Sequence, residues 1–396
     1  MAFKEFRVLD KGIEIQLQSG KLMSSDGEDG DNLIEDPELG SVRAYFNFYW
    51  LRDNCPTSFD KSTRERSFDI FQLSQAPVPE DVTLSDDYLT IKWLNEDHTS
   101  QYSFQMLRDY SAPKKRHDPV DELKPKLWLS DNFMNIKRYS LDELTKDNVE
   151  LLEFVRAIFV DGAVIVNGML ENDLDNLVEL LGHKTPCIFG TTFDVNLKQD
   201  PSNTAYTSGA LELHTDMPAM ENPPDVQFLH FMKNSTTGGT SLMADGISVA
   251  KQFQQQDPHG FKMLSETEIP YFCDHDDFDI RSKHTVIKLD SQGEVKGLSV
   301  SQHMLDKLDI DQKVLDLYYP ALCRFGVMLR DEKFLMRYKM AAGECMVFDN
   351  HRMVHGRDAY VGESGERHLR GTYISYCELK SKYRSLNASI LNSKCS

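Results

Sequence analysis

His214-Thr215-Asp216, near the middle of the chain, and Cys345-Met346-Val347-Phe348-Asp349, which leads to His355, decide how these 396 residues are interpreted. Alternate residues of a β-strand point to one side, so His214 and Asp216 are expected to face one metal ion while Thr215 faces away. The later run predicts a buried strand, and the turn at 350–356 brings His355 as a third ligand. Two histidines and one carboxylate form the facial triad of non-haem iron(II) oxygenases. The sequence therefore predicts an iron site.

Two other metal sites are possible. His351 lies four residues before His355, the spacing of a zinc-binding pair on a helix. The glutamate that a zinc hydrolase needs is replaced by Arg352, so we expect a structural role for His351. The acidic run Asp274-His275-Asp276-Asp277-Phe278-Asp279 resembles a calcium-binding loop but lacks the glycine and the closing glutamate of that motif. We expect a solvated loop there.

Arg367 is the candidate that would hold a co-substrate. An iron oxygenase needs an electron donor, usually 2-oxoglutarate, whose distal carboxylate requires a fixed cation. A guanidinium suits this task because it grips a carboxylate with two parallel hydrogen bonds. Arg370 would point to the opposite face of the same strand, so Arg367 is preferred. Without the metal motif, an exposed arginine in a salt bridge would be the better interpretation.

Several motifs, spread in order over nearly the whole chain, resemble one family. The sequence is similar to the γ-butyrobetaine/trimethyllysine dioxygenase family of Fe(II)/2-oxoglutarate oxygenases. The run Arg281–Asp290 resembles the butyrobetaine branch and only poorly the trimethyllysine branch. The other motifs are Trp50-Leu51-Arg52-Asp53-Asn54-Cys55-Pro56, His214-Thr215-Asp216-Met217-Pro218-Ala219, Pro223-Pro224-Asp225-Val226-Gln227-Phe228-Leu229-His230, Thr237-Gly238-Gly239 with Asp245-Gly246, and Phe348-Asp349-Asn350 through His355-Gly356-Arg357.

The resemblance implies roles for individual residues. Iron(II) would be held by His214, Asp216 and His355. The co-substrate 2-oxoglutarate would be bound by Arg367, with help from Ser241. The family's substrates carry a quaternary ammonium, which makes no conventional hydrogen bond and is bound by aromatic faces. The family's aromatic cage, and its amide for the substrate carboxylate, fall on Phe189, Phe193, Tyr206, Tyr373 and Asn203.

The chain departs from its relatives around the substrate. Phe189 and Phe193 occupy positions that are Tyr and Trp in them. Because Trp offers the strongest cation-binding face, Phe193 should weaken the cage while leaving it aromatic. A second carboxylate-binding asparagine, expected near Ser299-Val300-Ser301-Gln302, is replaced by Ser or Gln. These changes leave the exact substrate open.

The resemblance implies hydroxylation of γ-butyrobetaine to L-carnitine with O₂, in carnitine biosynthesis, with succinate and CO₂ as co-products. It also implies ascorbate as reductant and a homodimer. Trimethyllysine and other quaternary or cationic amines are alternative substrates. A non-catalytic ligand-binding member of the fold is an alternative of another class, which the intact triad and Arg367 disfavour.

Composition and charge favour a globular protein of the cytosol. The chain has 63 acidic and 44 basic residues and a net charge of −19, whereas a nucleic-acid binder would carry a basic stripe. No apolar run reaches about 18 residues, so we expect no membrane span, and the N-terminus has no signal-peptide run. The seven cysteines are scattered singly, which predicts free thiols in a reducing compartment.

The chain is expected to have two domains. Residues 1–112 contain short alternating segments typical of a small β-rich domain, and 113–127 form a linker. In 128–390, helices are predicted at 149–158, 174–181, 249–255 and 314–329, and Pro320 should kink or divide the last of them. Strands are predicted at 163–167, 227–232 and 241–244. This mixture indicates an α+β protein, and the resemblance adds a double-stranded β-helix, or jelly roll, with flanking helices.

Structural zinc is predicted to be absent from the N-terminal domain. Relatives bind zinc there through three cysteines, the first of which matches Cys55, and a histidine that matches His98. Pro56-Thr57-Ser58-Phe59-Asp60 follows Cys55, so two of the expected thiolates are missing. Because structural zinc normally takes four protein ligands, we expect this domain to fold on its own apolar core.

Overall fold

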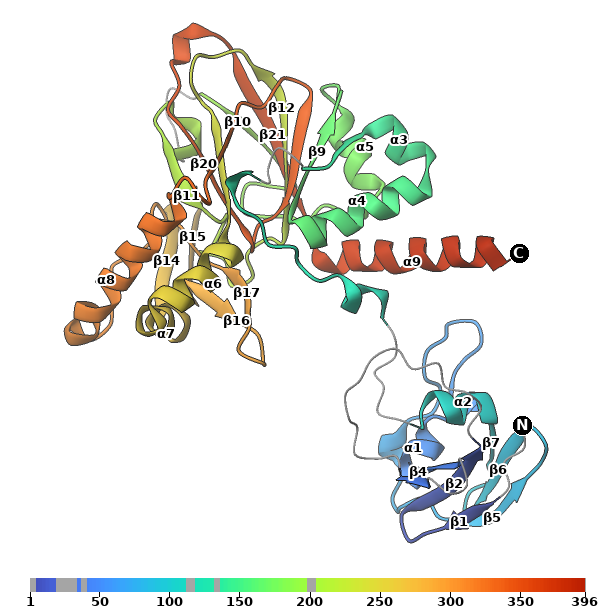
Figure 1. Ribbon diagram of the computed structural model, residues 1–396. Coiled ribbons are helices and arrows are strands. Elements are labelled where there is room, and N and C mark those ends of the chain that lie inside the picture. Colours follow the sequence, from blue (N-terminus) through green and yellow to red (C-terminus); the bar gives the residue numbers. More distant parts are fainter. Residues whose placement is uncertain are drawn as a thin grey trace. The chain divides into compact units, whose positions relative to one another are not determined.

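A computed structural model describes residues 5–18, 34–36, 41–111, 118–131, 136–197 and 204–395. The chain divides into two compact units, Met1–His117 and Asp118–Ser396, which are described separately below (Figure 1). Within the segment expected to be a linker, the 3-10 helix η3 (Pro119–Glu122) belongs to the second unit, and Val120 packs against that unit's core. The finer boundaries expected at 112, 127 and 390 stay predictions.

The N-terminal unit is built on two antiparallel sheets around one core. Alternating buried residues of these strands, such as Ile13 and Ile15 or Leu89, Ile91 and Trp93, form that core. The first sheet has the order β1-β2-β4-β3 and the second β5-β6-β7. The elements are β1 (Phe6–Val8), β2 (Gly12–Gln18), β3 (Ile34–Asp36), β4 (Ser41–Asn47), α1 (Phe48–Asp53), η1 (Pro56–Ser58), η2 (Ile70–Gln72), β5 (Pro79–Leu84), β6 (Tyr88–Trp93), β7 (Thr99–Ser103) and α2 (Phe104–Asp109).

The two expected zinc-ligand positions of this unit have other surroundings. Cys55 is buried, and its Sγ lies 3.1 Å from the Thr57 hydroxyl. His98 Nε2 is enclosed and has no hydrogen bond to any residue that the structure describes. Among the described residues of the unit, no three metal-ligating side chains come together. Folding without zinc stays a prediction, which metal analysis of the purified protein would test.

The second unit contains two facing sheets, the α+β jelly-roll architecture expected for it (Figure 1). All their strand pairs are antiparallel except β8 with β9. The larger sheet has the order β10 (Thr192–Asn196), β21 (Arg367–Ile374), β12 (Val226–Asn234), β19 (Glu344–Asp349), β9 (Ala163–Asn167) and β8 (Arg138–Ser140). The smaller sheet has the order β11 (Leu211–His214), β20 (Met353–Arg357), β13 (Ser241–Asp245) and β18 (Met336–Tyr338).

Strands β9 and β19 of the larger sheet are buried on both faces, which explains their nearly continuous apolar sequences. In β19, Met346 and Phe348 face the smaller sheet and pack with Met243 and Met353. Cys345 and Val347 face the opposite way and pack against helices. These helices are α3 (Leu141–Lys146), α4 (Asn148–Asp161), α5 (Asp173–Glu179) and α9 (Tyr376–Cys395), seen beside the larger sheet in Figure 1.

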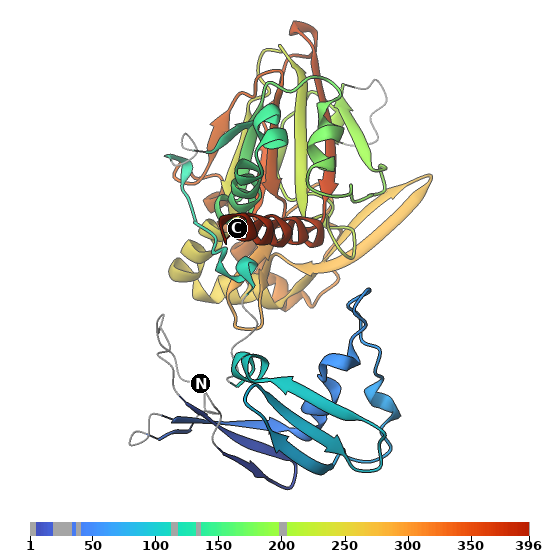
Figure 2. The same cartoon turned by 90° about the vertical axis from the view of Figure 1, so that its right-hand side faces the viewer.

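A separate apolar cluster joins the remaining helices to two hairpins. The acidic run Asp274–Asp279, for which a solvated loop was expected, forms the exposed tip of the first hairpin. This hairpin projects from the unit in Figure 2. The hairpins are β14 (Glu268–His275) with β15 (Phe278–Thr285) and β16 (Ile287–Leu289) with β17 (Val295–Leu298), and the helices are α6 (Gly246–Gln256), α7 (Pro258–Glu266) and α8 (Gln312–Leu329).

Helix α8 is not divided at Pro320, because it continues through this residue as one helix. Tyr318, Ala321, Phe325 and Leu329 are buried at helical spacing, and this apolar face anchors both halves of the helix. Packing therefore outweighs the hydrogen bond that proline cannot donate.

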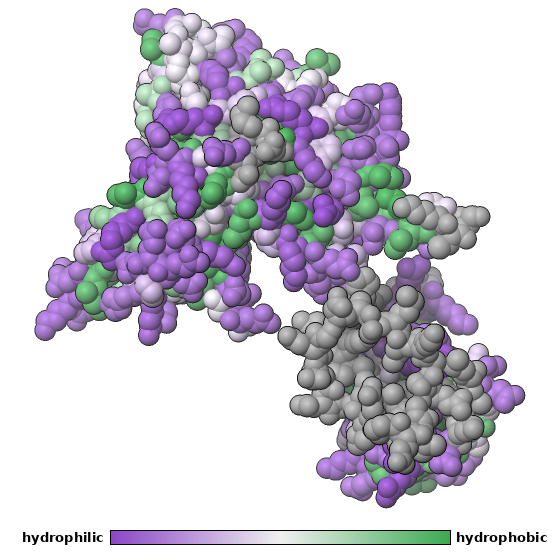
Figure 3. All heavy atoms as spheres, in the orientation of Figure 1, coloured by the Kyte–Doolittle hydropathy of each residue, from purple (hydrophilic) through white to green (hydrophobic). Residues whose placement is uncertain are grey.

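The surface of this unit is mostly polar. Hydrophilic residues predominate on the face shown in Figure 3, and apolar residues appear there in small groups. No helix among the described residues has both the length and the apolar character needed to cross a bilayer.

Candidate active site

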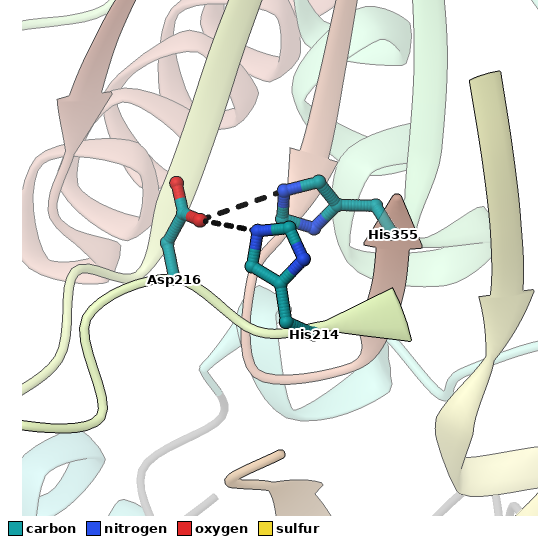
Figure 4. Close-up of side chains that lie close together, drawn as sticks. All are labelled: His214, Asp216 and His355. Atoms are coloured by element: carbon teal, nitrogen blue, oxygen red, sulfur yellow. Dashed lines mark ion pairs between the residues drawn. The ribbon is translucent and has the colours of Figure 1, made fainter. Parts of the chain in front are cut away.

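His214, Asp216 and His355 come together between the sheets (Figure 4). His214 ends β11, and His355 on β20 is its direct partner across the strand pair. His214 Nε2 lies 3.1 Å from Asp216 Oδ1, and His355 Nε2 lies 3.6 Å from the same oxygen. One nitrogen or oxygen of each side chain lies within 4.8 Å of the others, so the group could hold a metal ion.

The local structure around these residues differs from the predicted one. Strand β11 ends at His214, so Asp216 does not share a strand with it. Asp216 lies in the loop that follows, and Met217 after it has a φ of 58°, in the left-handed region. His355 lies within strand β20 and not in a turn. Strand alternation alone was therefore the wrong reason for pairing His214 with Asp216.

Asn350 holds the backbone of this loop in place. Its fully buried side chain accepts a hydrogen bond from Asp216 N at 2.7 Å. Its amide nitrogen donates to the carbonyl oxygens of Asp216 at 3.1 Å and Pro224 at 2.8 Å. One side chain from the β19–β20 connection thus fixes the carboxylate-bearing segment that follows β11.

Hydrogen bonds set the protonation of the triad. His214 Nδ1 lies 2.8 Å from the Glu212 carbonyl oxygen, to which it can donate, leaving the Nε2 lone pair for a metal. Burial opposes ionisation of Asp216, but its close contacts with His214 and His355 outweigh this effect and lower its pKa well below the usual range. Burial and the neighbouring His214 lower the pKa of His355. An ionised carboxylate with a neutral imidazole is the state that binds metals.

Of two further residues near the triad in the fold or the sequence, Tyr373 contacts it and His351 does not. The Tyr373 hydroxyl donates to Asp216 Oδ2 at 2.6 Å, and burial followed by the negative charge of Asp216 raises the pKa of Tyr373. His351 lies outside the group, because its Nε2 is 2.8 Å from Asp225 Oδ1. It has the structural contact expected for it.

The predicted binding residues line one cavity with the triad. Its wall contains Arg367 and Ser241 together with all four predicted cage aromatics, Phe189, Phe193, Tyr206 and Tyr373. Asn203, the predicted amide, lies outside the described residues.

The aromatic side chains of the cavity pack against one another. The Phe193 and Tyr373 ring centroids are 5.4 Å apart, with the planes tilted by 34°. Phe189 packs edge-on against Phe278, at the tip of the β14–β15 hairpin, with centroids 6.2 Å apart. Phe193 lies directly over Gly371 of β21, where an added Cβ would be 2.4 Å from its ring. Glycine at 371 therefore provides the space that this ring occupies.

Arg367 is a buried cation without an ion pair among the described residues. It is 9% exposed, and its guanidinium carbon lies 5.3 Å from the Tyr360 ring centroid and 5.8 Å from that of Phe231. Burial and the nearby Arg357 lower its pKa to about 10, so it keeps its charge at neutral pH. Arg370 pairs instead with Asp194 at 3.0 Å. The alternative of an exposed, salt-bridged Arg367 is wrong.

Four residues of the site received no role from the sequence. Gln227, Arg357 and Asn350 stood within the quoted motifs, but only the folded chain shows that Gln227 and Arg357 line the cavity and that Asn350 holds Asp216. His303 also lines the cavity, and burial and His214 lower its pKa to about 4. No pattern in the sequence indicates that His303 lies beside His214, because the two are 89 positions apart.

A histidine-carboxylate triad inside a jelly roll defines the class of metal-dependent oxygenases. Residues 122–373 match the taurine catabolism dioxygenase TauD, TfdA family. The chain belongs to this family of dioxygenases.

Relatives over most of the chain carry more specific names. A γ-butyrobetaine dioxygenase from Pseudomonas sp. (strain AK-1) is 32% identical over 353 residues, covering 87% of this chain and 90% of the relative. A γ-butyrobetaine dioxygenase from Pongo abelii is 29% identical over 388 residues, covering 94% and 98%. Trimethyllysine dioxygenases are 22–24% identical to this chain.

Solved structures are also similar to part of this chain. An asparagine oxygenase in complex with Fe(II), 2S,3S-3-hydroxyasparagine and succinate has a TM-score of 0.47 and 16% sequence identity. The alignment covers 58% of this chain and 78% of that one.

Proposed function

We propose that this chain is an Fe(II)- and 2-oxoglutarate-dependent dioxygenase that hydroxylates γ-butyrobetaine to L-carnitine, releasing succinate and CO₂. The observation that carries the proposal is one cavity lined by the triad, an unpaired buried Arg367 and four aromatic side chains. The names of the relatives with 29–32% identity support γ-butyrobetaine as the substrate.

The metal would be held by His214 Nε2, His355 Nε2 and the Asp216 carboxylate. Their fit rests on the clustering of these atoms and on the Glu212 carbonyl, which occupies His214 Nδ1 and leaves Nε2 free. When bound, iron(II) supplies the activation of O₂ that side chains cannot perform. Tyr373 and Asn350 orient Asp216, as partners of metal ligands generally do.

Arg367 would grip the distal carboxylate of 2-oxoglutarate, with the Ser241 hydroxyl as a second donor. A buried guanidinium without a counter-ion lacks the compensation that buried charges normally have. A carboxylate ligand would supply that compensation and would be held by charge-assisted hydrogen bonds.

The quaternary ammonium would lie against Phe189, Phe193, Tyr206 and Tyr373. Aromatic faces attract a cation that cannot be hydrogen-bonded. The Tyr373 hydroxyl is already used by Asp216, so Tyr373 offers only its ring. Precise placement matters, because the hydroxylated position is the C–H bond that the pocket holds nearest the metal.

The test is a panel of quaternary amines, assayed for succinate release and for a hydroxylated product by mass spectrometry. We expect γ-butyrobetaine to give both, in equal amounts, and to be used with the highest kcat/KM. His355→Ala should abolish succinate release, with His275→Ala on the exposed hairpin tip as the matched control. Full activity of His355→Ala would contradict the assignment of the triad.

Trimethyllysine is the second candidate substrate, supported by the similarity to trimethyllysine dioxygenases. It shares the quaternary ammonium, and its amino acid end differs from the simple carboxylate of γ-butyrobetaine. Preferential hydroxylation of trimethyllysine in the same panel would replace the first proposal.

We also propose a cytosolic homodimer that uses ascorbate as reductant, as the family resemblance implies. Light scattering of the purified protein should give twice the mass of 45.4 kDa. Omission of ascorbate should lower the number of turnovers before inactivation.

A further inference from the structure

Most polar side chains in the wall of the cavity already have a partner or a proposed role. The Arg357 guanidinium donates to the carbonyl oxygens of Gly209 and Thr207, each at 2.6 Å. Gln227 is 2% exposed, and its enclosed Oε1 has no hydrogen bond within the described part of the chain. That atom is an acceptor, whereas the amide nitrogen of the same side chain is a donor. With Arg367 and Ser241 assigned to 2-oxoglutarate, His303 is one of the candidate donors left among the described residues of the wall, and its ring contacts a triad histidine.

His303 is fixed by two contacts. Its ring packs edge-on against His214, with centroids 4.8 Å apart and planes at 76°. Its Nε2 lies 3.3 Å from the hydroxyl of Ser301, a side chain that is 2% exposed. Its Nδ1 has no hydrogen bond to any described residue. If Ser301 donates to Nε2, the neutral ring carries its proton on Nδ1 and can donate a hydrogen bond there.

The proposed substrate requires such a donor. Its ammonium would occupy the aromatic side of the cavity, which leaves its carboxylate inside a largely apolar wall. A desolvated carboxylate is costly unless it accepts hydrogen bonds. The asparagine expected near Ser299-Val300-Ser301-Gln302 is absent, but this same segment brings His303 beside the triad.

We infer that His303 is a specificity-determining residue, whose Nδ1 donates a hydrogen bond to the carboxylate of the bound amine while Ser301 fixes the ring. The inference rests on the proposed function. It predicts that the enzyme distinguishes quaternary amines that carry a carboxylate from those that do not, and that His303 provides part of this distinction.

The experiment measures equilibrium binding by calorimetry on the full chain, without O₂ and with iron(II) and 2-oxoglutarate. Two probes are used, γ-butyrobetaine and butyltrimethylammonium, which lacks the carboxylate. His303→Ala should weaken γ-butyrobetaine binding by about tenfold or more, the effect of losing a hydrogen bond to a charged group. It should leave the affinities for butyltrimethylammonium and for the co-substrate within about twofold of those of the unmodified protein.

Two further variants separate recognition from support of the fold. His303→Asn can place an amide donor near the position of Nδ1 and should restore most of the γ-butyrobetaine affinity. Lys307→Ala changes an exposed side chain four residues along the chain that does not line the cavity and should bind both probes like the unmodified protein. Iron affinity and thermal unfolding of each variant show whether the triad and the fold are intact.

The outcomes distinguish this inference from the function on which it rests. If His303→Ala weakens both probes alike, or neither, the inference is overturned while γ-butyrobetaine remains the substrate. If the unmodified protein neither binds nor hydroxylates γ-butyrobetaine, the proposed function fails, and the inference fails with it.

Discussion

At the scale of single residues, the two parts of Tyr373 have different roles. Its hydroxyl contacts Asp216, a proposed metal ligand, whereas its ring lines the cavity. Tyr373→Phe keeps the ring beside Phe193 but removes the hydrogen bond to Asp216. Because partners of metal ligands commonly contribute 10–100-fold to affinity, we expect iron(II) binding to weaken by about tenfold or more. Anaerobic metal titration measures this loss.

The control for this prediction is Tyr338→Phe, which removes a hydroxyl that contacts Glu344 and does not line the cavity. It should leave the iron affinity unchanged. Equal iron affinity of Tyr373→Phe and the unmodified protein would show that the hydroxyl does not orient Asp216.

Replacing Arg367 is expected to weaken use of the co-substrate without lowering the stability of the fold. Arg367→Met removes a buried, unpaired cation but keeps an apolar side chain of similar length. Loss of hydrogen bonds between charged groups costs about 1.5–3 kcal/mol, so the co-substrate concentration needed for half-maximal rate should rise by about 10–100-fold. The melting temperature should not fall, since a buried unpaired charge is itself destabilising. Steady-state kinetics and calorimetry measure the two effects.

Arg370→Met, three residues along the same strand, is the matched control for this prediction. It removes a partly exposed ion pair with Asp194, and such pairs contribute about 1 kcal/mol or less. If Arg370→Met raised the half-saturating co-substrate concentration as much as Arg367→Met, Arg367 would lose its special role.

The triad residues could be predicted from the sequence because their types and order carry the chemistry. Their supports could not, because Asn350 and His303 act through atoms that only folding brings near residues 214–216. The sequence also gives no warning that Tyr373 contacts Asp216 with its hydroxyl as well as lining the cavity with its ring.

At the scale of elements, replacing Pro320 in helix α8 is expected to increase the stability of the protein. It is exposed inside α8 and cannot donate to the Asp316 carbonyl oxygen. Pro320→Ala should restore this hydrogen bond and raise the free energy of unfolding by about 1–3 kcal/mol. Urea unfolding monitored by circular dichroism measures the change.

Asp316→Ala, at an exposed position one turn earlier, is the control and should change stability by less than about 0.5 kcal/mol. No gain from Pro320→Ala would mean that the helix is already relaxed around its proline.

Buried strands were predictable as elements because their runs are apolar on both faces. The run 163–167 coincides with β9, and 241–244 lies within β13. Their neighbours were not predictable, since β12 pairs with both β19 and β21, which lie more than a hundred residues later. The short strand β20 was assigned to a turn because its pairing partners, β11 and β13, are equally distant.

At the scale of the whole molecule, the two units have separate apolar cores. One cluster of buried residues lies wholly within 13–107, and the three others contain only residues beyond 118. Since an apolar core of its own allows a domain to fold alone, the fragment 118–396 should fold and bind iron(II) with an affinity within about threefold of that of the full chain.

Calorimetry of the full chain should show two unfolding transitions, one of which the fragment reproduces. A single transition, together with an unfolded fragment, would show that the second unit depends on the first. Titration of the fragment with iron(II) gives the second, independent measurement.

Gly371 does not line the cavity, yet it limits the cavity's size. Phe193 can pack this closely on β21 only because residue 371 has no side chain. Any larger residue there would push the ring inward and narrow the space for the ligand without touching it. A substitution of Gly371, which lies behind Phe193, can therefore alter the range of substrates that fit. An inspection of ligand contacts would overlook this position.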